Sequence, residues 1–477
     1  MAEQVTAGRP SGALRRVLIP LALAQFICSF AGSNMNVMIN DMSEDLNTSV
    51  QGIQLAITIF LLVMAAFMIP GGKLTDRYGR KRCLNLGLAV YGVGAILSAV
   101  APGLPLLIVG NSILEGIGTA LLIPPVYILA TMTFSDLTSR ARAFGAINGS
   151  AGIGAATGPL IGGLIATAIS WRASFVFQAL VIVVIIVLSR RDVRDPVPPD
   201  PTRSFDIVGA LLSALGLILI VMGILAADQN LWLMLGLLLA GALVLVWFFL
   251  SVRAKERAGR EPLLSTSLFR NRTSNLGLIT QNVQWLVLMG ISFVVSAFLQ
   301  VVKGYNPIQT GLILTAATVG LLLSSLGAER FAKRRAQRTL IMAGFVATSA
   351  GIVLLLALAG LGAGIWAFLP GLFLIGLGIG LMLTPSVNVV QSSFSDERQG
   401  EISGLSRSVS NLGSSLGTAI AGTILVAGIT KIPDRSYALA LAVLAAISLI
   451  GLAAGFFLPR TAAPAATSVP DRTAPAQ

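Results

Sequence analysis

The stretch GIGTALLIPPVYILATMTFSD at 116–136 returns in altered form as GLGIGLMLTPSVNVVQSSFSD at 376–396. Seven residues are identical at an offset of 260 positions. They are Gly116, Gly118, Leu121, Pro125, Phe134, Ser135 and Asp136, which align with Gly376, Gly378, Leu381, Pro385, Phe394, Ser395 and Asp396. Each copy is mostly one long apolar run, which predicts a helix. A repeat at this separation indicates that the chain contains two copies of one helical bundle.

The composition identifies the surroundings of these helices. The 477 residues are 55% hydrophobic and 11% charged, whereas soluble proteins carry about 25% charged residues. The charges lie in short clusters between long apolar runs, a pattern typical of a membrane-spanning bundle. The net charge of +13 does not indicate a nucleic-acid partner, because Lys and Arg concentrate on the cytoplasmic side of membrane proteins.

The chain offers little for covalent chemistry or metal binding. It has no histidine and so lacks the commonest general base and the usual zinc ligand. Its two cysteines, Cys28 and Cys83, lie in or beside apolar runs, where they cannot form a disulfide scaffold or a Cys-rich metal site. Residues 1–16 are polar and the first apolar run can cross a bilayer, so we expect no cleaved signal peptide. We expect no enzymatic activity, no metal and no cofactor.

Fourteen apolar runs are long enough to cross a bilayer, which takes about 20 residues. They are 17–40, 51–71, 83–101, 105–134, 143–169, 173–189, 206–227, 231–252, 275–302, 307–327, 339–362, 365–394, 402–429 and 437–458. If both termini are cytoplasmic, 28 of the 33 Lys and Arg residues lie in cytoplasmic loops and tails, 4 lie outside, and Arg407 lies within a helix. This asymmetry follows the positive-inside rule through every helix. We therefore predict an all-α, multi-pass membrane protein with fourteen helices and both termini in the cytoplasm.

The repeat divides these helices into three parts. Glycines of the fifth and thirteenth runs also align, one residue out of the first register: Gly145, Gly154 and Gly158 with Gly404, Gly413 and Gly417. The first six and the last six helices are therefore predicted to be copies, with the seventh and eighth inserted between them. We place the first bundle at 1–200, the inserted pair at 201–260, the second bundle at 261–460 and a disordered cytoplasmic tail at 461–477.

The segment GGKLTDRYGRKR (71–82) follows the second run. Gly72 and Gly79 allow a tight turn, and Asp76 can face a helix N-terminus. The segment resembles the signature loop of the major facilitator superfamily at Gly72, Leu74, Asp76, Arg77, Gly79 and Arg80. The resemblance implies two six-helix bundles with a substrate site between them near the midplane, latched at the cytoplasmic face by this loop. The alternative is a plain basic loop. The equivalent segment at 327–338 keeps the basic residues but lacks the Asp.

The fifth run contains GSAGIGAATGPLIGG (149–163), whose glycines create small faces for close helix packing. They are Gly149, Gly154, Gly158, Gly162 and Gly163. Pro159 predicts a kink. This stretch resembles the antiporter motif of the superfamily, which implies an exporter. The alternative is that the glycines only allow tight helix packing and do not indicate the direction of transport. Over roughly residues 15–460 the chain resembles the fourteen-helix drug:proton antiporters. The resemblance rests on the number of apolar runs and on two segments, WRASF (171–175) and EPLLSTSLFRNR (261–272).

The sequence departs from those antiporters in its first and fourth runs. The resemblance implies an Asp in the first helix, but Ala31 stands in its place, and Asn40 stands where a Pro is usual. Ser112 stands where the fourth helix usually carries an Arg. The carboxylate that binds the proton or cation in that family is therefore absent from the first helix.

Glu115 is the only acidic residue well inside an apolar run. Ten residues from Pro105 place it about 15 Å deep, near the bilayer midplane, and Asn111 and Thr119 share its helix face. Desolvation favours the protonated carboxyl there, so that protonation can occur near neutral pH. Because an intramembrane acid is by default a functional candidate, we predict that Glu115 couples transport to protons. The alternative is a structural, permanently protonated Glu between helices.

Arg407 lies about 9 Å into the thirteenth run. We expect it to snorkel to the cytoplasmic interface or to serve the structure; it can instead bind an anionic group or pair with a carboxylate.

Polar side chains line one face of three other runs. They are Gln25, Ser29, Ser33 and Asn36 in the first, Gln281, Trp285, Ser292 and Ser296 in the ninth, and Thr384, Asn388 and Gln391 in the twelfth. These faces predict a water-filled cavity between the bundles; hydrogen bonding between helices is the alternative. The candidate cavity residues are Gln25, Ser29, Asn36, Asn111, Trp285, Asn388, Gln391 and Arg407.

Together these features predict a proton-coupled exporter of small amphipathic organic compounds in a bacterial-type plasma membrane, working as a monomer by alternating access. Its expected partners are a small-molecule substrate, protons and the lipid bilayer. An exporter of lipids or lipid-linked anions is the alternative, favoured if Arg407 faces the cavity. A membrane sensor would need a folded output domain, and the longest loop has about twenty residues. An ATP-driven pump is not indicated, because the sequence has no GxxxxGK[ST] loop.

Overall fold

The computed structural model describes residues 12–134, 137–195, 200, 205–227, 230–332, 336–359, 364–394 and 398–459. Within those ranges every regular element is helical, and fourteen helical spans are long and apolar enough to cross a membrane. This confirms the all-α fold and the predicted number of spans. The tail predicted at 461–477 lies outside the described residues.

The α-helices are α1 (Gly12–Asn34), α2 (Ile39–Asp45), α3 (Val50–Tyr78), α4 (Arg80–Ala99), α5 (Leu104–Leu107), α6 (Gly116–Thr133), α7 (Leu137–Ala168), α8 (Trp171–Asp192), α9 (Ile207–Leu225), α10 (Leu231–Arg257), α11 (Arg272–Ala297), α12 (Pro307–Ala332), α13 (Gln337–Ala359), α14 (Leu369–Gln391), α15 (Gln399–Val426) and α16 (Pro433–Phe456). Three short 3-10 helices are η1 (Met35–Met38), η3 (Thr266–Arg270) and η5 (Gly364–Ala367). Two π-helical turns are η2 (Ile108–Glu115) and η4 (Phe298–Val302).

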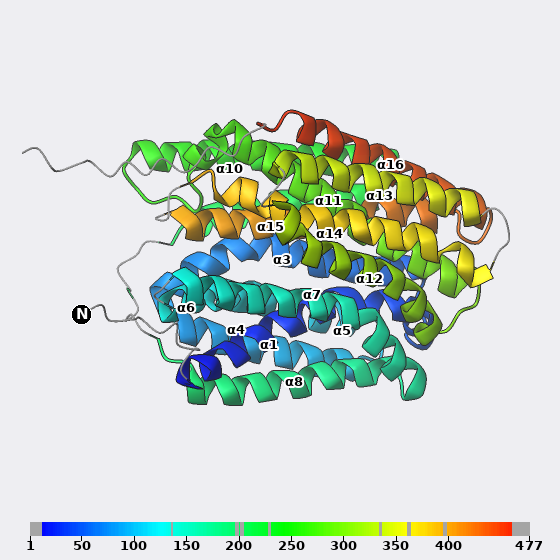
Figure 1. The fold of residues 1–477 in the computed structure, drawn as a ribbon, viewed down its shortest axis with the longest axis horizontal. Helices are drawn as coiled ribbons and strands as arrows, with labels where there is room; N and C mark the ends of the chain where they lie inside the picture. Colours follow the sequence, from blue (N-terminus) through cyan, green and yellow to red (C-terminus); the bar gives the residue numbers. More distant parts are fainter. Residues whose placement is uncertain are drawn as a thin grey trace, which may run out of the picture.

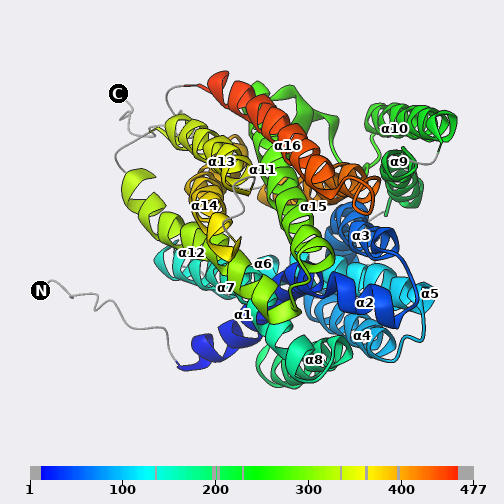
Figure 2. The ribbon, with the colours of Figure 1, turned by 90° about the vertical axis from the view of Figure 1, so that its right-hand side faces the viewer.

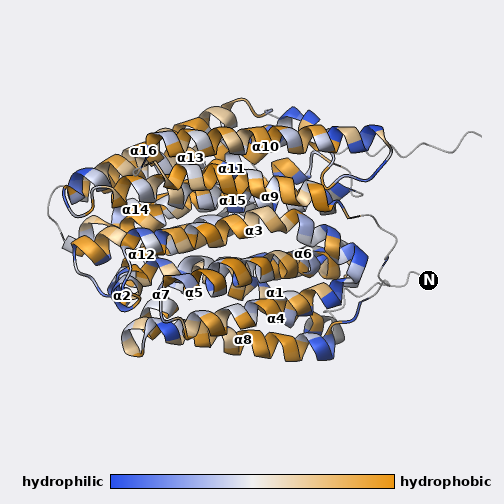
Figure 3. Ribbon diagram, turned by 180° about the vertical axis from the view of Figure 1, so that it is seen from behind, coloured by the Kyte–Doolittle hydropathy of each residue, from blue (hydrophilic) through white to orange (hydrophobic). Residues whose placement is uncertain are grey.

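The helices form two bundles that lie side by side (Figure 1). In the first bundle α1 packs on α7, and α4 packs on α6 and α8; in the second, α11 packs on α15, and α13 packs on α14 and α16. Each of these contacts in one bundle thus has its counterpart in the other. The helices are apolar along most of their length and hydrophilic towards the two ends of the molecule (Figure 3), as expected of a protein surrounded by lipid.

The two ends of the molecule differ in charge, and we name them by residues. The basic end is the one that carries Arg80, Arg190 and Arg257, where α4 begins and α8 and α10 end. The far end is the opposite one, which carries Asp45 and Arg172. The charge asymmetry of the sequence predicts that the basic end is cytoplasmic.

Helix α3 meets α4 at a single residue. α3 runs to Tyr78, and Gly79 adopts φ +96° between the two helices, a conformation that favours glycine. The sequence predicted that a loop starts at Gly71, but the structure shows that Gly72 is helical and that only Gly79 turns the chain. Hydropathy marks where a helix leaves the apolar layer, whereas hydrogen bonds within the backbone continue the helix beyond it.

Side-chain caps mark where several helices begin. Ser49 accepts a hydrogen bond from the backbone N–H of Gly52 at the start of α3. At the start of α8, Ser170 accepts one from the backbone N–H of Ala173. Asp206 caps α9 through Gly209 N at 2.7 Å, accepts from Leu263 N at 3.1 Å, and pairs with Lys255. Asp206 therefore ties α9 to the end of α10 and to the segment that leads into the second bundle.

The inserted helices α9 and α10 lie at the edge of the molecule beside α3 (Figure 2). α9 packs on both α3 and α15, and Val221 and Leu225 share one buried cluster with Leu62 of α3 and Ala419 of α15. α9 therefore covers a line where the two bundles meet, while α10 packs on the other side of α9.

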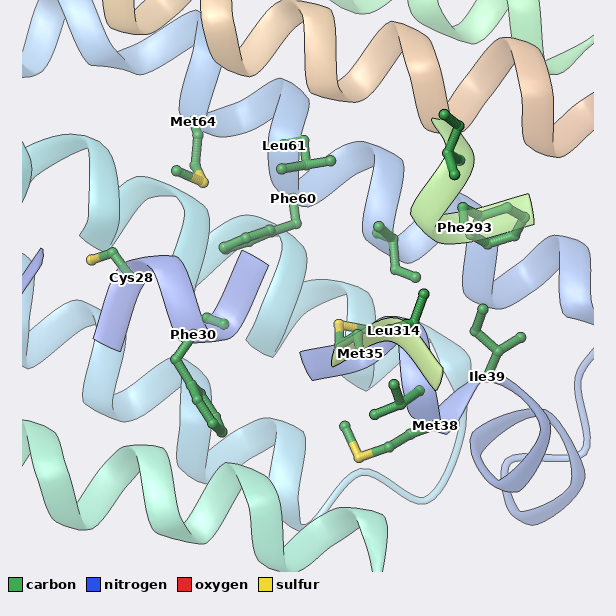
Figure 4. Packing of buried hydrophobic residues seen from close by; sticks show 14 of the residues in the cluster. Cys28, Phe30, Met35, Met38, Ile39, Phe60, Leu61, Met64, Phe293 and Leu314 are labelled. Atoms are coloured by element: carbon green, nitrogen blue, oxygen red, sulfur yellow. The ribbon is translucent and has the colours of Figure 1, made fainter. Parts of the chain in front are cut away.

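A continuous apolar core joins the bundles (Figure 4). Phe30 of α1, Phe60 of α3 and Phe293 of α11 are buried in it together with Ile39 of α2. These residues come from both bundles, so the packing of apolar side chains holds the halves together around the line between them.

Candidate functional site: a cleft between the bundles

Polar contacts close the far end of the line between the bundles. Gln300 Oε1 accepts from the backbone N–H of Asn40 at 3.1 Å, and Gln300 Nε2 donates to the carbonyl oxygen of Asn36 at 2.8 Å. Nearby, the backbone N–H of Ile308 donates to Thr167 Oγ1 at 3.1 Å. Each of these bonds joins one bundle to the other, and together they seal the far end.

The two bundles face each other along two helix pairs, α3 with α15 and α7 with α12, which we call the seams. The seam between α3 and α15 is closed along its length. Towards the far end, Gln54 Nε2 donates to the carbonyl oxygen of Thr418 at 3.1 Å. In the middle, Ser415 Oγ donates to the carbonyl oxygen of Thr58 at 3.0 Å. At the basic end, Lys73 pairs with Glu401 at 3.3 Å.

The second seam, between α7 and α12, is closed only at the far end. A Cβ atom added to Gly163 of α7 would lie 2.5 Å from the carbonyl oxygen of Pro307, so the two backbones touch there. Gly152, Gly149 and Gly145 follow on the same face of α7 towards the basic end, and a Cβ atom on any of them would meet nothing within 4 Å. α7 and α12 therefore diverge, and a cleft opens between the bundles at the basic end.

Polar side chains reach this cleft from both bundles. Arg407 of α15 donates from Nη2 to the hydroxyl of Tyr127 on α6 and to Asn148 Oδ1 on α7, the latter at 3.3 Å. The Tyr127 hydroxyl donates to Asn148 Oδ1 at 2.8 Å, and Arg407 Cζ lies 5.2 Å from the centroid of the Tyr127 ring. Arg407 thus reaches across to the first bundle, whereas the sequence led us to expect snorkelling or a structural role.

Sequence reasoning missed Tyr127 and Asn148. Asn148 stands directly before the glycine-rich stretch of α7 as a polar residue in an apolar run, a signal that could have marked it. Tyr127 carried no such signal, because the spacing of residues along α6 does not show which helix from the other bundle lies opposite.

The predicted cavity residues do not gather in one place. Asn388 is exposed on α14, and Gln391 Nε2 donates to Ser403 Oγ of α15 at 3.4 Å, both towards the basic end. Asn36 belongs to the far-end seal, and Asn111 binds Glu115 inside the first bundle, so neither lines the cleft at the basic end. The other predicted residues are Gln25, which donates to Ser29 at 3.4 Å, and the half-buried Trp285 of α11.

Glu115 is fully buried inside the first bundle. Its two carboxyl oxygens lie 3.4 Å from Ser98 Oγ and from Asn111 Nδ2, and the Tyr91 hydroxyl, which donates to Gln178 Oε1, is also near the carboxyl. Glu115 ends the π-helical turn η2, and a Cβ on Gly94 of α4 would lie 2.9 Å from its Cγ. The side chain therefore points towards α4. Among the described residues it has no cationic partner, and only neutral groups solvate it.

The structure places the latch motif at the end of α3. Asp76 accepts from Arg80 at 3.1 Å, and Arg77 Cζ lies 5.6 Å from the ring centroid of Tyr78. Lys73 of the same segment crosses to α15 and pairs with Glu401. Gly72 and Leu74 belong to the last turns of α3, and Gly79 makes the turn.

The antiporter motif divides between two surroundings. On α7, Gly154, Gly158 and Gly162 face α1, and a Cβ on Gly162 would lie 2.9 Å from Asn34 Cβ. Gly163 and Pro159 contact α12. Gly149, predicted to provide a packing face, faces the cleft instead, because α12 has moved away from α7 at that height.

Comparison with known proteins places the chain in a family. The family model described as Major Facilitator Superfamily matches residues 21–269 and 277–477. The puromycin resistance protein of Streptomyces alboniger is 29% identical over 85% of this chain and 81% of its own length. The probable actinorhodin transporter of Streptomyces coelicolor is 30% identical over 88% of this chain and 74% of its own length. A multidrug efflux pump of Mycolicibacterium smegmatis is 28% identical over 86% and 80%.

Solved structures agree on the fold. The crystal structure of the peptide transporter POT in complex with sulfate has a TM-score of 0.69 at 17% identity, covering 94% of this chain and 96% of that one. A mutant of a POT peptide transporter, also in complex with sulfate, has a TM-score of 0.67 at 18% identity, covering 91% and 93%. With two matching bundles, a cleft between them and a family model that spans nearly the whole chain, the protein belongs to the Major Facilitator Superfamily.

Proposed function

We propose that the protein exports small amphipathic organic compounds from the cytoplasm in exchange for protons. The observation that carries this proposal is the cleft between α7 and α12, open at the basic end and sealed at the far end. The positive-inside rule makes the basic end cytoplasmic, so this shape would be the state that loads substrate from inside. The names of the relatives, which refer to puromycin resistance, actinorhodin transport and multidrug efflux, support an organic substrate.

Alternating access requires that the far-end seal opens while the cleft closes. The bonds of Gln300 to Asn36 and Asn40 would then break. At the basic end, Gly145, Gly149 and Gly152 offer α12 a face without side chains, on which two helices can pack closely. In that closed state Asp76 would meet the start of α15 near residues 401–404, where an acid is favoured by the helix dipole, and this contact would add to the Lys73–Glu401 pair that already joins the two helices there.

Glu115 would bind the coupled proton. Its carboxyl lies among neutral groups only, so its charged form is poorly solvated and its neutral form is favoured. Tyr91 donates to Gln178 Oε1 at 2.5 Å, and loss of the Glu115 proton would draw that hydroxyl towards the carboxylate. Such a switch would change how α4 packs on α6, and α6 also carries Tyr127, about 18 Å further along the helix and in the cleft. The alternative is a neutral Glu115 that only joins α4 to α6.

The remaining features of this proposal concern how the chain sits and works. We propose that it acts as a monomer in a bacterial plasma membrane, with the first bundle at 1–200, the inserted pair at 201–260 and the second bundle at 261–460. Both termini would be cytoplasmic. Single cysteines test the orientation: an impermeant thiol reagent applied from outside should label position 45 and not position 78. Labelling of position 78 from outside would contradict it.

Transport in liposomes tests the function. Purified protein is reconstituted, a pH gradient is imposed, and the movement of a panel of fluorescent amphipathic dyes, beginning with N-phenyl-1-naphthylamine, is followed. We expect uphill movement that collapses when the gradient is dissipated. Glu115→Gln should abolish it, whereas Glu44→Gln, a matched change in an exposed carboxylate near the far end, should not. Equal movement with and without the gradient would contradict proton coupling.

A further inference from the structure

Arg407 brings a positive charge into the cleft and is held there by neutral groups. It lies about 12 Å from the start of α15, and Tyr127 lies about 9 Å from the basic end of α6. The Tyr127 hydroxyl and Asn148 Oδ1 both accept from Arg407 Nη2, and the Tyr127 ring lies under the guanidinium. These contacts fix the position of the guanidinium without neutralising its charge.

No carboxylate balances that charge in the part of the chain that the structure describes. None of the salt bridges found there includes Arg407. Of the helices that border the cleft, α6 and α14 have no charged residue, and α7 contributes only Arg140 and Arg142. α12 carries one acid and one base, Glu329 and Arg330, next to each other near its basic end, so their charges cancel in sum. The one acid on α15, Glu401, pairs with Lys73. The potential in this part of the cleft is therefore positive and attracts anions.

Room for a ligand adjoins the guanidinium. Gly404 precedes Arg407 by about one turn of α15, and Gly145 and Gly149 flank Asn148 on α7; a Cβ on any of the three would meet nothing within 4 Å. A guanidinium has five N–H donors in a planar fork. Since the contacts to Tyr127 and Asn148 use Nη2, the other donors are available to a carboxylate, sulfonate or phosphate, which such a fork can bind through two bonds.

We propose that Arg407 binds the acidic group of the transported compound, so that the preferred substrates are amphipathic organic anions. This inference rests on the proposed function and adds the chemical class of the substrate. The apolar part of the compound would lie against the ring pair of Tyr127 and Phe144, whose centroids are 5.9 Å apart. The same chemistry suits a lipid phosphate, and the experiment separates the two sources.

Binding of a matched pair of probes tests the proposal. The probes are 8-anilino-1-naphthalenesulfonate and N-phenyl-1-naphthylamine, which is the same scaffold without the sulfonate. Radiolabelled probes are bound to the full-length protein in nanodiscs of neutral lipid, with empty nanodiscs as background. We expect the wild-type protein to bind the sulfonate at least tenfold more tightly than the neutral probe. Arg407→Gln should remove that preference and change the affinity for the neutral probe less than threefold, and Arg407→Lys should retain part of it.

Controls keep the result independent of folding and of transport. Arg435→Gln removes an exposed cation at the far end and should leave the preference intact. Retained affinity for the neutral probe shows that Arg407→Gln is folded. If the wild-type protein binds both probes equally, or Arg407→Gln weakens both equally, the anion site is refuted, and pH-driven transport of the neutral probe would still support the proposed function. If phosphatidylglycerol in the nanodisc displaces the sulfonate, the anion is a lipid phosphate; if it does not, the anion belongs to a free amphipathic compound.

Discussion

The fourth helices of the two bundles occupy equivalent places but differ at one buried position. In the first bundle, Gly118 of α6 would meet the α4 residues Gly87 and Tyr91 if it carried a Cβ atom. In the second, Gly378 of α14 stands in the same relation to Gly344 and Thr348 of α13. The position that differs lies one turn away on the same face. Glu115 packs against Gly94 of α4 in the first bundle, and Ile375 packs against Gly351 of α13 in the second.

The same comparison shows that the first bundle holds one extra residue beside Glu115. Gly110 packs on Gly94 and Ser98 of α4, while its counterpart Gly371 packs on Gly351 and Leu355 of α13. Six steps separate residue 110 from residue 116, but only five separate 371 from 376. The π-helical turn η2 accommodates the extra residue, and single π-turns of this kind often lie at functional sites. The buried acid and the inserted residue thus occur together, in one copy only.

The largest effect is expected when the acid is moved into the second bundle. Ile375→Glu would bury a carboxyl where Gly351 and Leu355 offer no side-chain donor, at a cost of about 3 kcal/mol in a membrane interior. We expect little folded protein in size-exclusion chromatography and a lower thermal unfolding midpoint in detergent. Glu115→Ile, which gives the first bundle the residue of the second, should fold. A stable Ile375→Glu protein would show that the two sites are chemically alike.

A smaller effect should distinguish the two ends of the α7–α12 seam. Gly163→Ala places a Cβ against the carbonyl oxygen of Pro307, and we expect it to lower the free energy of unfolding by about 1–3 kcal/mol. Gly149→Ala adds the same methyl group where nothing lies within 4 Å, so it should change stability by less than about 0.5 kcal/mol. Unfolding in detergent measures both. Equal destabilisation would mean that the seam is closed along its whole length.

The smallest effect should come from the ion pair at the closed α3–α15 seam. The Lys73 and Glu401 side chains are 29% and 25% exposed, so water screens their attraction, and such pairs contribute about 0–1 kcal/mol. A double-mutant cycle with Lys73→Met and Glu401→Gln should give a coupling energy within that range. A coupling well above it would show that this pair, rather than the buried contacts of α3 with α15, holds the seam at the basic end.

Much of the fold could be predicted because lipid imposes simple rules on sequence. The length of the apolar runs and the distribution of Lys and Arg were enough to predict fourteen spans. The repeat was enough to predict two related bundles. Helix ends were less predictable: the run predicted at 17–40 is continued by η1 and α2 as far as Asp45, because polar residues there stay helical beyond the most apolar segment.

The site was less predictable, because its contacts cross between bundles. Glu115 stood out as the only acid deep in an apolar run, but the sequence did not show that it faces α4. The identities between the two copies begin at Gly116, so the extra residue in η2 lies just before the stretch in which the repeat is visible. Arg407 was recognised as unusual, but its partner Tyr127 lies 280 residues away in the chain, and no local pattern connects them.

The central claim is that the protein exchanges a proton for substrate and that this proton binds at Glu115, a site which only the first bundle has. Proton release tests it most directly: the transported dye is added to purified protein in weakly buffered detergent, and the pH change is followed with an indicator. We predict that the wild-type and Glu44→Gln proteins release protons on binding the dye and that Glu115→Gln binds the dye but releases none. Proton release from Glu115→Gln equal to that of the wild type would contradict the claim and leave Glu115 as a structural link between α4 and α6.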